Sequence, residues 1–265
     1  AKAYTMGNQI TFSGSTDLEN GLNVAMSYVL DQGDDVSAGA VVASAKGPFD
    51  GHSITLTHDT LGTIKFSGEG GSSTASSIDT TAAGDLWDNT LINTTSALAT
   101  RKAPIASTSG DNLMVYSLPT LVDGLSISAS YSSGGLAVNS TTAFGATYTG
   151  VEGLSVSYGV GEAGSTTTTS QADVTTMKAS YAIGSFTAAV SNTENDRAST
   201  GTDEEMSSFK LSYTVSDDLS VSYESEKSEK NFLEVTAAIE QKSSAVQLAY
   251  TMGGMTIALS NGSYD

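Results

Sequence analysis

The chain has 265 residues, no Cys, 27 Gly and only 3 Pro, and its 11 Lys and Arg against 29 Asp and Glu give a formal charge of −18. The absence of Cys excludes a disulfide scaffold and any Cys metal site. The negative charge argues against a nucleic-acid partner, because the phosphates would be repelled. No run approaches the roughly 18 apolar residues of a membrane helix, whereas a membrane β-strand needs only about ten residues with alternate apolar side chains.

The dominant period of the sequence is two. Apolar residues alternate with small or polar ones in several stretches: 22–30, 125–131, 154–160, 209–215 and 219–224. Successive side chains of a strand point to opposite faces, so each stretch predicts a strand with one apolar and one polar face. Helical spacing is nearly absent, and good helix formers are sparse. The chain is therefore predicted to be all-β, with about fourteen strands.

Two kinds of connection alternate along the chain. Short ones, rich in the Gly, Asp and Asn that tight hairpins require, fall at 17–21, 60–62, 119–124, 150–153, 184–185, 216–218 and 253–254. Longer polar ones fall at 31–51, 69–111, 132–141, 161–172, 193–204 and 226–243. Short turns at one rim and long loops at the other predict a transmembrane, antiparallel up-and-down β-barrel, since a soluble sandwich has loops of mixed length at both ends.

The composition of the two strand faces also favours a membrane barrel. One face is mostly Ser, Thr and Ala, and the other carries large apolar residues with almost no charge. Tyrosines near the predicted strand ends are typical of the aromatic girdles of membrane barrels, although strand propensity alone explains any single one. These tyrosines are Tyr28, Tyr131, Tyr148, Tyr158, Tyr181, Tyr213, Tyr223 and Tyr250.

Residues 69–111 form the longest interval without a strand pattern. The interval is first Gly-rich and then Ser/Thr-rich, and it contains Trp87, the only Trp of the chain. It also contains the apolar pair Leu91-Ile92 and the only adjacent Arg-Lys pair, Arg101-Lys102. A segment this long without regular structure is usually either functional or disordered.

Two segments resemble the Gram-negative general (trimeric) porins. Residues 13–22, Ser-Gly-Ser-Thr-Asp-Leu-Glu-Asn-Gly-Leu, resemble the first periplasmic hairpin of that family, although Thr16 and Glu19 depart from its pattern. Residues 112–119, with Tyr, Ser and Pro before a short turn and then Gly124-Leu125-Ser126, are similar to the porin strand after the third loop. Val115 stands where that family often has a pore-facing Arg. In overall look the chain is most similar to alphaproteobacterial outer-membrane porins.

The resemblance implies a sixteen-stranded barrel and a homotrimer. Residues 1–265 would form one β-barrel domain, with 69–111 as the third loop, folded into the lumen as a constriction. The second loop, 31–51, would reach toward a neighbouring subunit. Porin termini lie in the periplasm, but the first and last predicted strands here would end at the outer rim. We therefore expect one further strand before Ala1 and another after Asp265.

Charged residues within the strand patterns are expected to face the lumen, because a Lys facing lipid at mid-depth costs about 2–4 kcal/mol. The candidates are Lys65, Glu69, Lys178, Lys210 and Glu224. These side chains either select among ions or merely keep the lumen wet. Because the chain is strongly acidic and lumen bases are few, a preference for cations over anions is predicted.

Charged residues of 69–111 are candidates for the narrowest part of the pore: Asp79, Asp85, Asp88, Arg101 and Lys102. Opposite charges across a narrow aqueous gap would create a transverse field. Arg101 and Asp85 would equally well tie the loop to the barrel wall. The apolar residues expected to hold the loop against that wall are Trp87, Leu91 and Ile92.

Other kinds of site find little support. His52 and His58 have no third His and no Cys to complete a zinc site. The Gly-rich residues 68–71 lack the Lys of a phosphate-binding loop, and no Ser/His/Asp arrangement indicates catalysis. Clustered carboxylates suit calcium, for which the candidate ligands are Asp31, Asp34 and Asp35. A solvated acidic loop is the favoured alternative there, because the spacing does not match an EF-hand.

The sequence therefore predicts a porin in the outer membrane of a Gram-negative bacterium, with no enzymatic activity and no cofactor. Small hydrophilic solutes and ions would diffuse through it passively. Its expected partners are two identical subunits and outer-membrane lipids. The alternative is a secreted or surface-layer, adhesin-type structural β-protein, which an acidic chain rich in Ser, Thr and Gly would also suit. The uncharged outer face favours the barrel.

Overall fold

The computed structural model of the chain describes residues 9–30, 49–78, 81–84, 86, 111–134, 139–164, 171–197, 202–232 and 239–264. Within these ranges it has fourteen strands. They are β1 (Ile10–Asp17), β2 (Asn23–Leu30), β3 (Phe49–His58), β4 (Gly62–Glu69), β5 (Leu113–Ser117), β6 (Leu125–Ser132), β7 (Thr141–Tyr148), β8 (Leu154–Ala163), β9 (Ala172–Ile183), β10 (Phe186–Arg197), β11 (Thr202–Ser216), β12 (Leu219–Phe232), β13 (Ile239–Met252) and β14 (Met255–Tyr264). None of the described segments is a helix long and apolar enough to cross a membrane.

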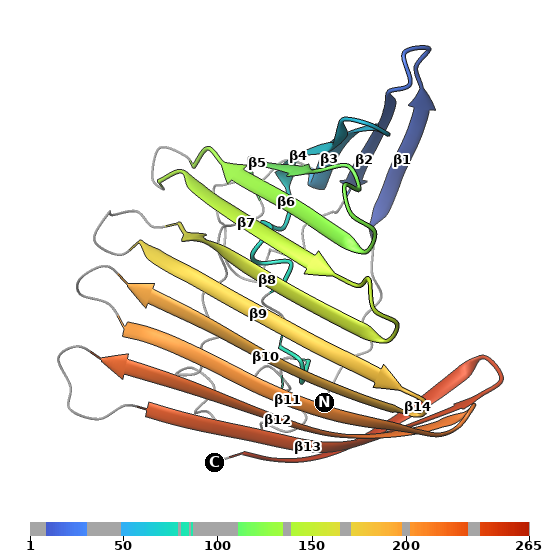
Figure 1. Ribbon diagram of the computed structural model, residues 1–265, viewed down its shortest axis with the longest axis vertical. Coiled ribbons are helices and arrows are strands. Elements are labelled where there is room, and N and C mark those ends of the chain that lie inside the picture. Colours follow the sequence, from blue (N-terminus) through green and yellow to red (C-terminus); the bar gives the residue numbers. More distant parts are fainter. Residues whose placement is uncertain are drawn as a thin grey trace, which may run out of the picture.

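The strands form one curved antiparallel sheet in which each pairs with its neighbours in sequence, from β1 to β14 (Figure 1). The predicted all-β, up-and-down order is confirmed, and so are the seven short turns. At the turn before β4, Gly62 has a φ of 84°, and a Cβ there would lie 2.3 Å from the Ser117 carbonyl oxygen, so only Gly fits. The described residues show no pairing between β1 and β14, and the expectation of sixteen strands stays a prediction.

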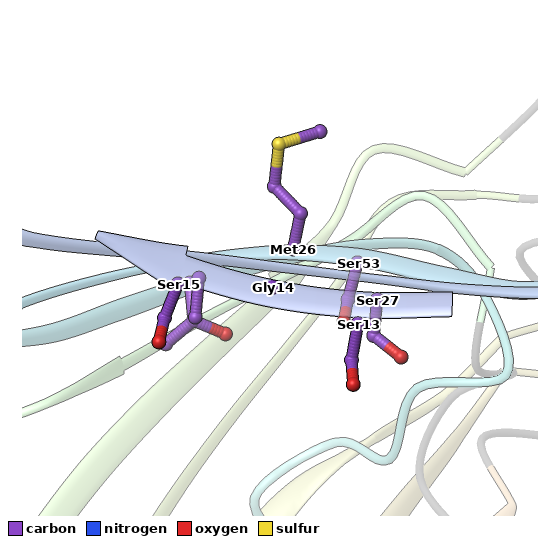
Figure 2. Close-up of a pocket in the computed structure, with 8 residues that line it drawn as sticks. Ser13, Gly14, Ser15, Met26, Ser27 and Ser53 are labelled. Atoms are coloured by element: carbon purple, nitrogen blue, oxygen red, sulfur yellow. The ribbon is translucent and has the colours of Figure 1, made fainter. Parts of the chain in front are cut away.

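The register places small and hydroxylated side chains on one face of the sheet and large apolar ones on the other. Figure 2 shows this for β1–β3: Ser13, Ser15, Ser27 and Ser53 point to one side, and Met26 points to the other. Ser13, Ser27 and Ser53 occupy one row of registered residues across the three strands. We call the Ser-rich face the inner face and the apolar face the outer face.

The outer face carries a broad band of exposed apolar side chains over all fourteen strands. Its larger members, each at least 50% exposed, include Ile10, Phe12, Phe144, Tyr158, Met177, Ile183, Phe186, Met252, Met255 and Leu259. Side chains of this size exposed in such number on a single face indicate a surface that faces hydrocarbon instead of water.

The upper edge of the apolar band runs obliquely across the strands. One row of paired residues passes from Val160 on β8 through Thr175, Glu194, Glu205 and Glu229 to Glu240 on β13. The row therefore begins inside the apolar band on β8 and ends on β13 beyond the edge of the band that faces the long loops. On β13 the outward apolar residues begin at Val246, six residues after Glu240. Six residues over five strand spacings correspond to a strand tilt of about 40°, within the range of membrane barrels.

The tyrosines mark the edges of this band. All eight predicted girdle tyrosines occupy outer-face register positions. Tyr148, Tyr181, Tyr213 and Tyr250 lie near the short turns, in agreement with the prediction. Tyr158 and Tyr223 instead lie within long strands, because β8 and β12 continue past the apolar band.

Candidate pore lining and the loop segment packed on it

The residues that follow β4 fold back onto the inner face of the sheet. Residues 73–78, the first contact segment, form a tight turn in which the amide of Ser77 donates to the carbonyl of Ser73 at 3.0 Å. The amide of Thr74 donates to Ser130 Oγ on β6 at 3.0 Å. Ala75 and Ile78 are buried. This stretch therefore lies against the wall and not in solvent.

Glycines in the wall make room for the first contact segment. A Cβ added at Gly145 on β7 would lie 2.5 Å from Thr74 Cγ2 and 3.0 Å from Ile78 Cδ1. A Cβ at Gly159 on β8 would lie 3.3 Å from Ala75 Cα. Gly145 and Gly159 are paired in the sheet, so together they form a shallow recess in the inner face. The close approach of the loop backbone requires residues without side chains there.

Residues 81–84, the second contact segment, cross β10, β11 and β12. The amide of Ala82 donates to Ser191 Oγ at 2.9 Å, and the amide of Ala83 donates to Ser208 Oγ at 3.3 Å. Thr81 Oγ1 donates to Glu226 Oε2 at 2.8 Å. These three acceptors are paired with one another in the sheet register. The segment is therefore bound by one row of polar side chains on three adjacent strands.

Leu86 extends this contact to β13. Leu86 and Ala83 are both 2% exposed and cluster with Ala245. The register places Ala245 directly opposite Glu224 on β12. The Glu224 side chain, beside this cluster in the register, is also fully buried.

Glu224 lies in a polar cluster of its own, with a side chain that is 0% exposed. Lys210 Nζ lies 2.6 Å from its Oε1 and is 35% exposed. Ser222 Oγ donates to Oε1 at 2.9 Å, and Gln247 Nε2 donates to Oε2 at 2.5 Å. A buried carboxylate requires this pairing, because desolvation of an unpaired charge is costly. Glu224 therefore acts as a neutralised structural group.

Of the remaining predicted lumen-facing charges, Lys65 and Lys178 occupy inner-face positions by register, and Glu69 does not. Lys65 on β4 pairs with Thr55 and Val115 and is exposed. Lys178 on β9 pairs with Ser157 and Ser191. Glu69 ends β4 beyond a register shift and pairs with His52, which itself pairs with the outer-face Tyr28. Lys65 and Lys178 lie apart on the wall, whereas Lys210 and Glu224 form a pair.

The predicted constriction residues Asp79, Asp85, Asp88, Arg101 and Lys102 lie outside the described residues. So do the wall-holding candidates Trp87, Leu91 and Ile92, and the calcium candidates Asp31, Asp34 and Asp35. His52 and His58 lie at opposite ends of the pairing between β3 and β4. In the described part of the chain, no three His, Cys, Asp or Glu residues come close enough to hold a metal ion.

Several residues that hold the loop were missed by the sequence reasoning. Glu226 falls in a stretch interpreted as a long polar connection, but β12 continues through it to Phe232. Ser191 and Ser208 have nothing in the sequence to distinguish them from the other serines. The pairing of Gly145 with Gly159 becomes recognisable only once the register is known.

A tilted antiparallel sheet with an apolar outer face and a loop packed on its polar inner face defines the class of outer-membrane β-barrel channels. A family model described as Gram-negative porin matches residues 2–265, and the chain belongs to that family. It is accordingly an outer-membrane protein of a Gram-negative bacterium. Family membership does not support the alternative of a secreted or surface-layer structural protein.

Solved structures show the same fold at low sequence identity. The chain is similar to the anion-selective porin from Comamonas acidovorans, with 16% identity and a TM-score of 0.65 over 97% of this chain and 77% of that one. It is also similar to OmpF of Salmonella typhi, with 13% identity and a TM-score of 0.63 over 96% of this chain and 81% of that one. A third solved structure, of a porin refined at 1.8 Å resolution, has 14% identity and a TM-score of 0.66 over 97% of this chain and 86% of that one. No curated protein sequence matches the chain.

Proposed function

We propose that the protein forms a water-filled channel through which small hydrophilic solutes and ions diffuse passively, with no catalytic step. The observation that carries this proposal is the position of residues 73–86. Their described part contacts the inner face on β6, β7, β8, β10, β11, β12 and β13. A segment held there takes up space that water and solutes would otherwise occupy. Residues 69–111 are accordingly the constriction loop of this proposal.

Single-channel recording in planar bilayers tests the constriction. Shortening the loop by deleting residues 89–100 leaves both contact segments in place while removing bulk from the rest of the loop. We expect conductance to rise and larger solutes to pass in a liposome-swelling assay. Unchanged conductance and solute cutoff in a folded variant would place the loop outside the conducting path.

The finer parts of the proposal are cation preference and a homotrimer. The formal charge of −18 supports a preference for cations. Because a similar fold occurs in a porin described as anion-selective, charge placement and not fold has to set the sign. Reversal potentials in a salt gradient measure that sign. Native mass spectrometry and crosslinking measure the assembly state, and contacts from residues 31–51 to a neighbouring subunit are expected.

A further inference from the structure

In the described part of the chain, exposed carboxylates gather toward the two ends of the strands. The seven short turns together carry six exposed carboxylates and no Lys or Arg. These carboxylates, which we call the short-turn ring, belong to Glu19, Asp59, Asp123, Glu152, Asp217 and Asp218. Every short turn joins an odd-numbered strand to the next even-numbered one, so antiparallel order places all seven at one rim of the sheet. This is the periplasmic rim of a membrane barrel.

The lumen wall, by contrast, is almost balanced in charge. Among described side chains at inner-face strand positions above the rim there are three lysines and three glutamates. The three glutamates, Glu204, Glu224 and Glu226, are at most 5% exposed. Lys65 is exposed, and Lys210 is 35% exposed. Because the lysines offset these buried carboxylates, the described part of the wall provides no strong preference for cations.

We propose that the short-turn ring sets the ion selectivity of the channel, by concentrating cations and excluding anions at the periplasmic mouth. The inference rests on the proposed channel function and assigns its cation preference to these six residues. The effect is a distributed field and not a binding site. A potential of one kT at the mouth changes the local ratio of cations to anions about sevenfold, and protein surfaces commonly reach such potentials.

A field of this origin has two physical signatures. It is screened by salt, because the Debye length falls from about 30 Å at 0.01 M to about 3 Å at 1 M. In dilute salt the potential of six exposed carboxylates around a rim therefore extends across the mouth. In concentrated salt it is screened within a few ångströms of each carboxylate. The field of the short-turn ring is also centred on one mouth, so the ring acts most strongly when the dilute solution bathes the periplasmic mouth.

The test uses the complete chain inserted in one orientation in a planar bilayer, with KCl gradients. Reversal potentials are measured in tenfold gradients centred near 0.03 M and near 1 M, with the dilute side placed at either mouth. The variant carries E19Q, D59N, D123N, E152Q, D217N and D218N, amides that suit turns. The matched control neutralises six carboxylates on the outer face near the opposite rim: E162Q, D173N, E194Q, D196N, D203N and E205Q.

We expect the cation-to-anion permeability ratio of the unmodified channel to fall several-fold from dilute to concentrated salt. The ratio should be highest with the dilute side at the periplasmic mouth. In the short-turn variant the permeability ratio should no longer change with salt concentration. The control should retain most of that change. A ratio independent of salt, or an equal loss in the control, overturns the inference while leaving a cation-preferring channel intact. Absence of any conductance would instead overturn the proposed function.

Discussion

Thr81 and Glu226, 145 positions apart in the chain, are joined by a hydrogen bond of 2.8 Å that ties the second contact segment to β12. A hydrogen bond to a carboxylate contributes about 1.5–3 kcal/mol, more than one between neutral groups. Two backbone amides of the same segment bind neighbouring strands through serine hydroxyls. The position of the loop thus depends on a few polar groups of the wall.

Removing either partner of this hydrogen bond should loosen the loop. We expect Thr81→Val and Glu226→Ala each to increase current noise and raise the mean single-channel conductance. Glu226→Gln should have a smaller effect, because its amide oxygen still accepts from Thr81. The double variant T81V/E226A should show less than the sum of the single effects, as expected when both substitutions break one interaction. Strict additivity would contradict a shared contact.

A substitution at Gly145, in the recess under the first contact segment, tests the position of the loop independently. Gly145→Ala places a methyl group against Thr74 Cγ2 and Ile78 Cδ1, an overlap that costs about 1–3 kcal/mol unless the loop moves. We expect the loop to shift, with altered conductance and faster cleavage by added protease. Thr74→Ser removes the clashing methyl group and should partly restore the original behaviour. Gly14→Ala is the matched control, because nothing lies within 4 Å of that Cβ.

The ion pair between Lys210 and Glu224 should matter for stability and not for selectivity. Lys210→Met leaves a fully buried carboxylate without its cation, a change that costs about 3 kcal/mol, less what water reaching the site recovers. The double variant K210M/E224Q removes both charges and should regain most of this loss. Urea unfolding of the detergent-solubilised protein measures both effects. If the double variant instead changed the reversal potential, Glu224 would have to act on the lumen.

The sequence was sufficient to predict the strand number, the antiparallel order and the short turns, because alternation and turn residues are local properties. Alternation also predicts one common face for Lys65, Lys178, Lys210 and Glu224, and in the register all four occupy inner-face positions. What these charges do could not be predicted, because Glu224 is buried opposite Ala245, against which Leu86 and Ala83 of a distant segment pack. The wall sites that hold the loop depend on register across up to seven strands, and pairing between strands leaves no local signal.

The assignment of the two faces can be tested on adjacent residues of one strand. Leu211 of β11 lies on the outer face, 42% exposed, and Ser212 faces the opposite way. Leu211→Arg places a charge in hydrocarbon and should destabilise the barrel by about 2–4 kcal/mol near mid-depth. Ser212→Arg adds the same side chain to the aqueous side and should fold normally while shifting selectivity toward anions. Folding yield into lipid vesicles, read by electrophoretic mobility without heating, measures the difference. Equal yields for the two variants would contradict the orientation of β11.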